Sequence, residues 1–161
     1  MEKEQKPQVL IIGVGNLYRG DDAAGLLAVR RLKEMRLDSS VIMEHSGEGA
    51  SLLEKWKNAD AVIVIDAVDS GSALGTIHRI EPIEKPLPAG MFHTSTHAFS
   101  LPEAIELARA LNELPPRLLV FGIEARNFQA GSEMSPEVRD AIQKVAKMVA
   151  DEATALQSAL R

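Results

Sequence analysis

The sequence predicts an α/β protein, folded as a three-layer α/β/α sandwich around a mostly parallel, twisted sheet. Two observations support this prediction. Short, wholly apolar runs recur along the chain, as in strands that are buried on both faces of a parallel sheet. Between them, apolar residues recur at the three- and four-residue spacing of amphipathic helices. Strands that alternate with helices in this way pair in parallel, with helices on both faces of the sheet.

The first half of the chain shows the alternation most clearly. An apolar strand is expected over residues 8–14, followed by a helix from Asp22, which Asp21 or Asp22 would cap. The next strand, helix and strand are expected over residues 40–44, 49–58 and 61–65. The run Ala-Val-Ile-Val-Ile in the last of these predicts a fully buried strand.

The second half continues the pattern after a long irregular connection. A strand is expected near residues 75–81, and the prolines and glycine between positions 82 and 90 exclude regular structure there. A helix over residues 99–113 and an apolar strand over residues 117–123 follow. The last helix is expected to begin at Pro136, because proline loses no hydrogen bond at the first helical position.

Size and composition limit the classes of protein to consider. A chain of 161 residues suits one domain, and we expect residues 1–161 to form it. The formal net charge is -5 and the basic residues are scattered, which excludes a nucleic-acid partner. No apolar run is long enough for a membrane span, and the charged amino terminus does not resemble a secretory signal. We therefore expect a cytoplasmic protein without a membrane partner.

Candidate functional residues lie where the predicted strands end, which is where open α/β sheets bind ligands. These residues are Asp21 and Asp22 after the first strand, His45 after the second, Asp66 and Asp69 after the third, and His97 before a helix. Taken singly, each has an ordinary structural interpretation as a helix cap or as a partner of a loop. Together, two carboxylates and an imidazole suit a divalent metal and leave room for a donor from a substrate. The chain has no cysteine, so oxygen and nitrogen are the expected ligands.

The run GVGNLYRGDDAAG, residues 13–25, begins like a dinucleotide-binding turn but departs from it. The third glycine of that fingerprint falls on Tyr18, and the two aspartates would repel a pyrophosphate. The sequence also lacks the Gly-x-Ser-x-Gly and His-Glu-x-x-His signatures of common hydrolases. A nucleotide cofactor and serine hydrolysis are therefore both disfavoured.

Three motifs, in this order and spacing, resemble those of the hydrogenase maturation proteases. They are GVGNLYRGDDAAG after a strand, VIVIDAVDSG in the middle, and HTSTHAFSLPEAIELA, which is followed by the strand containing FGIEA. The resemblance spans nearly the whole chain. It implies an endopeptidase of aspartic type that removes a carboxy-terminal extension from the precursor of the large subunit of nickel-iron hydrogenase, after nickel has been inserted.

The resemblance also implies which residues act. Matching the motifs position by position gives a metal-binding and catalytic triad of Asp22, Asp66 and His97. Some members carry glutamate at the first of these positions, so the shorter aspartate changes the reach of this ligand and not its charge. The loop Ser46-Gly47-Glu48-Gly49, in which Gly47, Glu48 and Gly49 are the expected substrate-binding residues, resembles the family's glycine-containing segment that helps to admit the substrate tail.

The implied metal is nickel, supplied by the precursor and recognised through the three side chains, although other divalent metals would fit the same ligands. The metal would either polarise the scissile carbonyl or activate a water molecule. The implied partner is the hydrogenase large-subunit precursor, processed by a monomer. Two alternatives remain open: a noncatalytic, metal-dependent chaperone that holds the precursor tail, and a related peptidase that acts on another protein.

Overall fold

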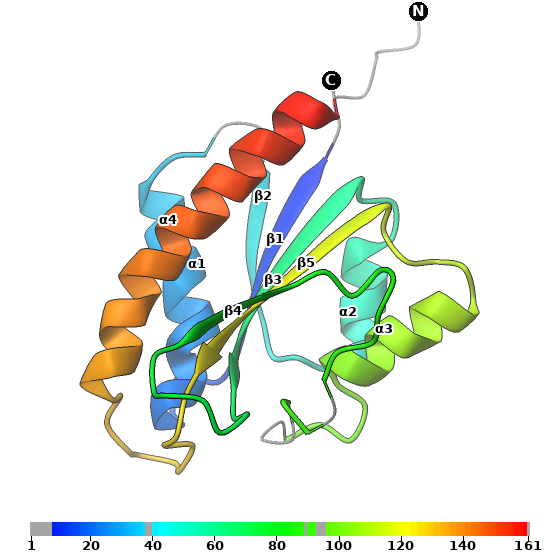
Figure 1. Cartoon of the computed structure of the whole chain (residues 1–161). Coiled ribbons are helices and arrows are strands. Elements are labelled where there is room, and N and C mark those ends of the chain that lie inside the picture. Colours follow the sequence, from blue (N-terminus) through cyan, green and yellow to red (C-terminus); the bar gives the residue numbers. More distant parts are fainter. Residues whose placement is uncertain (1–7, 38–39, 89, 93–95, 161) are drawn as a thin grey trace, which may run out of the picture.

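A computed structural model describes residues 8–37, 40–88, 90–92 and 96–160, and its centre is a five-stranded sheet (Figure 1). The strand order is β2-β1-β3-β5-β4. Four strands run parallel, namely β1 (Val9–Val14), β2 (Ser40–His45), β3 (Ala61–Val68) and β5 (Arg117–Glu124). The edge strand β4 (Ile77–Ile80) is antiparallel to β5. The predicted, mostly parallel sheet is confirmed.

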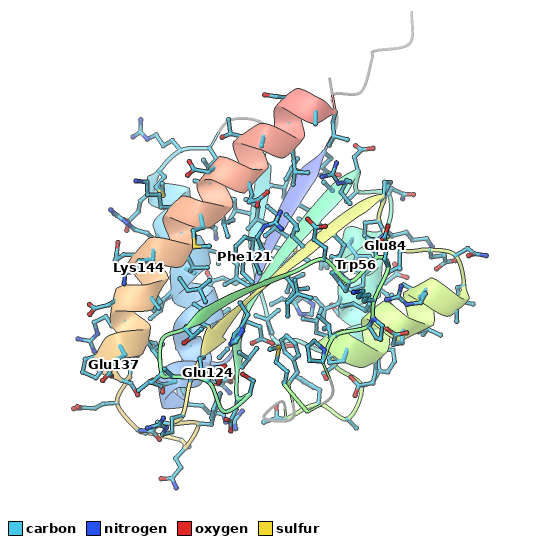
Figure 2. All side chains as sticks on the ribbon, viewed as in Figure 1. Trp56, Glu84, Phe121, Glu124, Glu137 and Lys144 are labelled. Carbon is cyan, nitrogen blue, oxygen red and sulfur yellow. The ribbon has the colours of Figure 1, made fainter. Side chains whose placement is uncertain are left out.

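Helices cover both faces of the sheet, which confirms the three layers (Figure 1). On one face lie α1 (Ala24–Glu34) and α4 (Pro136–Ala159), and on the other lie α2 (Gly49–Trp56) and α3 (Leu101–Ala110). Each face has its own hydrophobic core. Phe121 packs with the α1 and α4 layer, whereas Trp56 packs with the α2 and α3 layer (Figure 2).

The central strands are apolar throughout because both of their faces are covered. All six residues of β1 are buried, and alternate residues enter opposite cores: Ile11 faces α1 and α4, and Ile12 faces α2. Burial of each such side chain contributes about 1.5–3 kcal/mol relative to exposure. This burial holds the carboxyl ends of β1 and β3 side by side.

Gly25, the last residue of the first motif, allows α1 to approach these strand ends closely. A Cβ atom added at Gly25 would lie 2.3 Å from the carbonyl oxygen of Val14 and 2.4 Å from that of Ile65. Any side chain there would push the helix away from β1 and β3. The glycine therefore fixes the position of the short 3-10 helix η1 (Gly20–Ala23), which carries both aspartates of the motif.

Two details differ from the sequence prediction. The segment with Asp21 and Asp22 forms η1 before α1 begins at Ala24, and neither aspartate caps a helix, since no side-chain hydrogen bond caps η1 or α1. Asp66 lies inside β3 and does not follow it, because β3 continues to Val68, which pairs with Glu124 of β5. Within the described residues, no helix combines the length and the apolar character that a membrane crossing requires.

Candidate active site

A small polar cavity of about 70 Å³ lies at the carboxyl edge of the sheet. Asp22, Asp66 and His97 all line it, so the structure brings together the three residues that the sequence singled out. A whole cofactor needs a pocket several times larger, so this space suits an ion or the reacting part of a larger substrate. The other lining residues are Val14, Gly15, Asn16, Ser46, Phe92 and Thr96.

Asp22 enters the cavity from η1 and is only 9% exposed. Burial raises the pKa of Asp22 above its ordinary value, an effect that the guanidinium of Arg19 and the backbone N–H of Asn16 oppose. The Nη1 atom of Arg19 lies 3.4 Å from Oδ2 of Asp22. The same guanidinium is anchored through Nε, which donates to the carbonyl oxygen of Phe128 at 3.0 Å. Asp22 thus has one fixed cationic neighbour.

Asp66 lies in β3, within the sheet, and lines the cavity together with Asp22. Burial raises the pKa of Asp66 well above its ordinary value, and the negative charge of Asp22 raises it further. The backbone N–H of Ala67 donates to Oδ1 at 2.8 Å and opposes both effects. Two carboxylates that repel each other in a largely enclosed space favour either a shared proton or a cation between them.

His97 lines the cavity and also lies near the segment after β2. It lies close enough to His45 and Glu48 to contribute to lowering the pKa of each, in addition to larger local effects. For His45 the larger effect is burial, which lowers the pKa of the imidazole. Nδ1 of this ring accepts the Gly47 N–H at 2.9 Å, which leaves Nε2 to donate to the hydroxyl of Ser51 at 2.9 Å. His45 therefore shapes the turn beside His97.

The residues predicted to bind substrate lie next to the cavity but not on its lining. Glu48 caps α2, because its carboxylate accepts the N–H groups of Ala50 and Ser51, both at 2.9 Å. Gly47 and Gly49 are buried, and a Cβ atom on Gly49 would lie 2.3 Å from the ring of Phe99. These contacts give each of the three residues a structural role in the turn between β2 and α2. Their role toward substrate stays a prediction.

Asp21, the neighbour of Asp22, has a purely structural environment. Its side chain is fully buried, and its two oxygens accept four hydrogen bonds of 2.7–3.1 Å. The donors are the N–H groups of Arg126, Asn127 and Ser135 and the hydroxyl of Ser135. Asp21 thus joins η1 to the segment after β5 and to the start of α4. It does not line the cavity.

The donor chemistry of the cavity suits a divalent metal, since two carboxylates with raised pKa values gain from a nearby cation. In the described ranges, however, no three His, Asp or Glu side chains are already arranged around a common metal position. The triad therefore shares a cavity without forming a closed ligand set. The first three residues of the third motif, 93–95, lie outside the described residues.

Sequence reasoning missed several residues of the site. Arg19 pairs with Asp22, and Asn16 and Thr96 add polar groups to the lining. Arg19 lies three residues before Asp22 and Thr96 directly precedes His97, whereas Asn16 lies two residues after the end of β1. The rule that ligands bind at strand ends could have indicated Asn16, whereas no local pattern marks the pairing of Arg19 with Asp22.

Fold and cavity together define an α/β/α protein with a carboxylate and imidazole site at the carboxyl edge of its sheet. Comparison with known proteins gives the family. The family model for hydrogenase maturation protease matches residues 26–152. The chain belongs to the hydrogenase maturation protease family.

Individual relatives agree with this assignment. The chain is 31% identical over 145 residues to hydrogenase expression/formation protein HupD of Thiocapsa roseopersicina, covering 88% of this chain and 66% of that protein. It is 32% identical to HoxM of Azotobacter vinelandii, covering 76% of this chain and 60% of the relative. The chain thus spans less than two thirds of the length of these two curated relatives.

Solved structures agree as well. The hydrogenase maturating endopeptidase HybD of Escherichia coli superimposes with a TM-score of 0.73 at 25% identity, covering 88% of this chain and 89% of the other. A maturation protease HycI of Thermococcus kodakarensis superimposes with a TM-score of 0.71 at 24% identity, covering 92% and 93%. At 24% identity, the similarity to HycI shows a shared fold.

Proposed function

We propose that this protein is an endopeptidase that removes the carboxy-terminal extension of a nickel-iron hydrogenase large-subunit precursor after nickel insertion. The observation that supports this most directly is the placement of Asp22, Asp66 and His97 on one cavity. The chain has no cysteine to act as a nucleophile. Membership of the maturation protease family supplies the class of substrate.

In this proposal nickel arrives as part of the substrate. A triad that shares a cavity without a closed ligand set suits a metal that already has ligands from another protein. Asp22, Asp66 and His97 would add oxygen and nitrogen donors to it and so position the scissile bond. Bound nickel supplies Lewis acidity, either to the scissile carbonyl or to the attacking water. A precursor without nickel would lack this anchor, and processing would then follow metal insertion.

The decisive experiment incubates the purified protein with the large-subunit precursor from the same organism, prepared with and without nickel. Intact-mass spectrometry is expected to show shortening of the nickel-loaded precursor only. A stable complex whose precursor keeps its full mass would instead indicate the noncatalytic chaperone. Full-length precursor without complex formation would direct the search to another protein substrate.

A divalent metal alone is expected to raise the melting temperature, since a cation relieves the repulsion between Asp22 and Asp66. At a hundredfold excess over the dissociation constant the stabilisation is about 2.7 kcal/mol, and it grows with the logarithm of the excess. Differential scanning calorimetry with nickel, zinc or cadmium measures the shift. The shift should be smaller in His97→Gln, which keeps both carboxylates but loses the imidazole ligand, and an equal shift in this variant would contradict the assigned ligands.

A further inference from the structure

The edge strand β2 is more exposed than the strands inside the sheet. Among the residues that the structure describes, it pairs with β1 alone and ends the strand order on that side. Its six residues are all partly or fully exposed, whereas all six residues of β1 are buried. Val41 is 41% exposed. An exposed strand edge presents unpaired backbone groups that another extended chain can join.

The hydrogen bonds between β1 and β2 define which backbone groups are free. The N–H of Gly15 donates to the carbonyl of His45 at 3.1 Å, and His45 is in register with Val14. Because the direction of these groups alternates along a strand, residues 41, 43 and 45 bond to β1. The N–H and C=O groups of Ile42 and Glu44 therefore point away from the sheet. In the described part of the chain, no strand or loop pairs with this outer edge.

The carboxyl end of β2 lies beside the cavity. Ser46, the residue after β2, lines the cavity together with residues that follow or belong to β1 and β3. The opposite edge, β4, is separated from β3 by β5, and neither β4 nor β5 contributes a lining residue. Of the two sheet edges, β2 is thus the one that continues into the site.

We propose that the carboxy-terminal segment of the precursor binds to β2 as an additional, extended strand. This proposal rests on the proposed function and names the binding surface for that substrate. The segment would pair with the outward N–H and C=O groups of Ile42 and Glu44, and its continuation past Ser46 would bring the scissile bond to Asp66 and His97. Backbone pairing tolerates varied side chains. The exposed side chain of Val41 offers one apolar contact to an adjacent residue of the segment.

The matched variants Glu44→Pro and Glu44→Ala test the proposal. Both remove the carboxylate that pairs with Arg30 at 2.8 Å, but only proline removes the outward N–H. Proline is tolerated on strand edges where the N–H faces outward. The KM for the nickel-loaded precursor is expected to be about tenfold higher in Glu44→Pro than in Glu44→Ala, with equal kcat. Equal KM values in the two variants would overturn the proposal.

Hydrogen exchange provides a second measurement that needs no variant of the edge. Asp66→Asn serves as the protease, so that the nickel-loaded precursor stays intact. Adding the precursor is expected to slow exchange at the amides of Ile42 and Glu44 about tenfold or more, and to leave Met43 and His45, already bonded to β1, unchanged. Unchanged exchange at Ile42 and Glu44 would refute strand addition. If exchange at Ile42 and Glu44 slows as the protease concentration rises in the absence of precursor, a second copy of this chain occupies the edge. That result would also overturn the proposal.

Failure of this inference can be separated from failure of the proposed function. The wild-type protein is assayed in parallel for shortening of the same precursor. Shortening without slowed exchange would overturn the edge proposal alone. Absence of shortening and of slowed exchange would overturn both.

Discussion

Asp66→Asn is expected to abolish shortening of the precursor while raising the stability of the free protein. The amide keeps the shape of the side chain but supplies no negative charge for a metal or a proton, so the rate should fall by about 10³-fold or more. Removing the charge also ends the repulsion from Asp22 in a buried space. Intact-mass spectrometry measures the first effect, and thermal unfolding measures the second.

The stability gain should depend on pH in a defined direction. The folded state raises the pKa of Asp66 above the usual 3.8, so the folded state binds this proton more tightly than the unfolded state does. The contribution of the Asp66 carboxyl group to folding stability is fully present below pH 3.8, and it is lost as the pH rises through the raised pKa. The advantage of Asp66→Asn should thus be smallest in acid and grow toward neutral pH. A gain of about 1 kcal/mol corresponds to roughly 2–4 °C in a domain of this size.

Asp69→Asn is the control for this variant, because it makes the same chemical change three residues further along and outside the cavity lining. It should process the precursor at the wild-type rate. Normal processing by Asp66→Asn, or an equal loss in both variants, would contradict the role assigned to Asp66. A loss of stability in Asp66→Asn would contradict the repulsion between the two carboxylates.

Asp21→Ala is expected to cause the largest loss of stability, about 3–5 kcal/mol. It removes a fully buried carboxylate that accepts four hydrogen bonds. Three of these come from backbone N–H groups, which would be left without this acceptor. The cost of unpaired buried donors, added to that of the lost hydrogen bonds, explains the magnitude. Urea unfolding followed by circular dichroism measures it.

Asp22→Ala provides the comparison for Asp21→Ala at the adjacent position. Asp22 has a raised pKa and one cationic neighbour at 3.4 Å, so its loss should cost little stability or none. Its loss should instead prevent processing of the precursor. Similar losses of stability in the two variants would show that the carboxylates do not divide into a structural and a functional residue.

Much of the fold followed from local patterns. The apolar runs at residues 8–14, 61–65 and 117–123 correspond to β1, β3 and β5, and Pro136 does begin the last helix. These predictions succeeded because burial on both faces of a strand requires apolar residues throughout, and a sequence records that requirement directly. The boundaries were less accurate, since β3 ends where its pairing with β5 ends.

The sequence by itself determined the α/β/α class and the order of the elements, and the strand ends indicated the edge of the sheet at which the site lies. The resemblance to the maturation proteases then selected the three residues that share the cavity. The sequence already made Asp22 the ligand and left Asp21 as a cap or support, and only the tertiary structure decided what Asp21 binds. The two residues are adjacent in one motif, yet the hydrogen-bond donors to Asp21 come from residues 105, 106 and 114 positions away. A local pattern cannot record partners that only folding brings together.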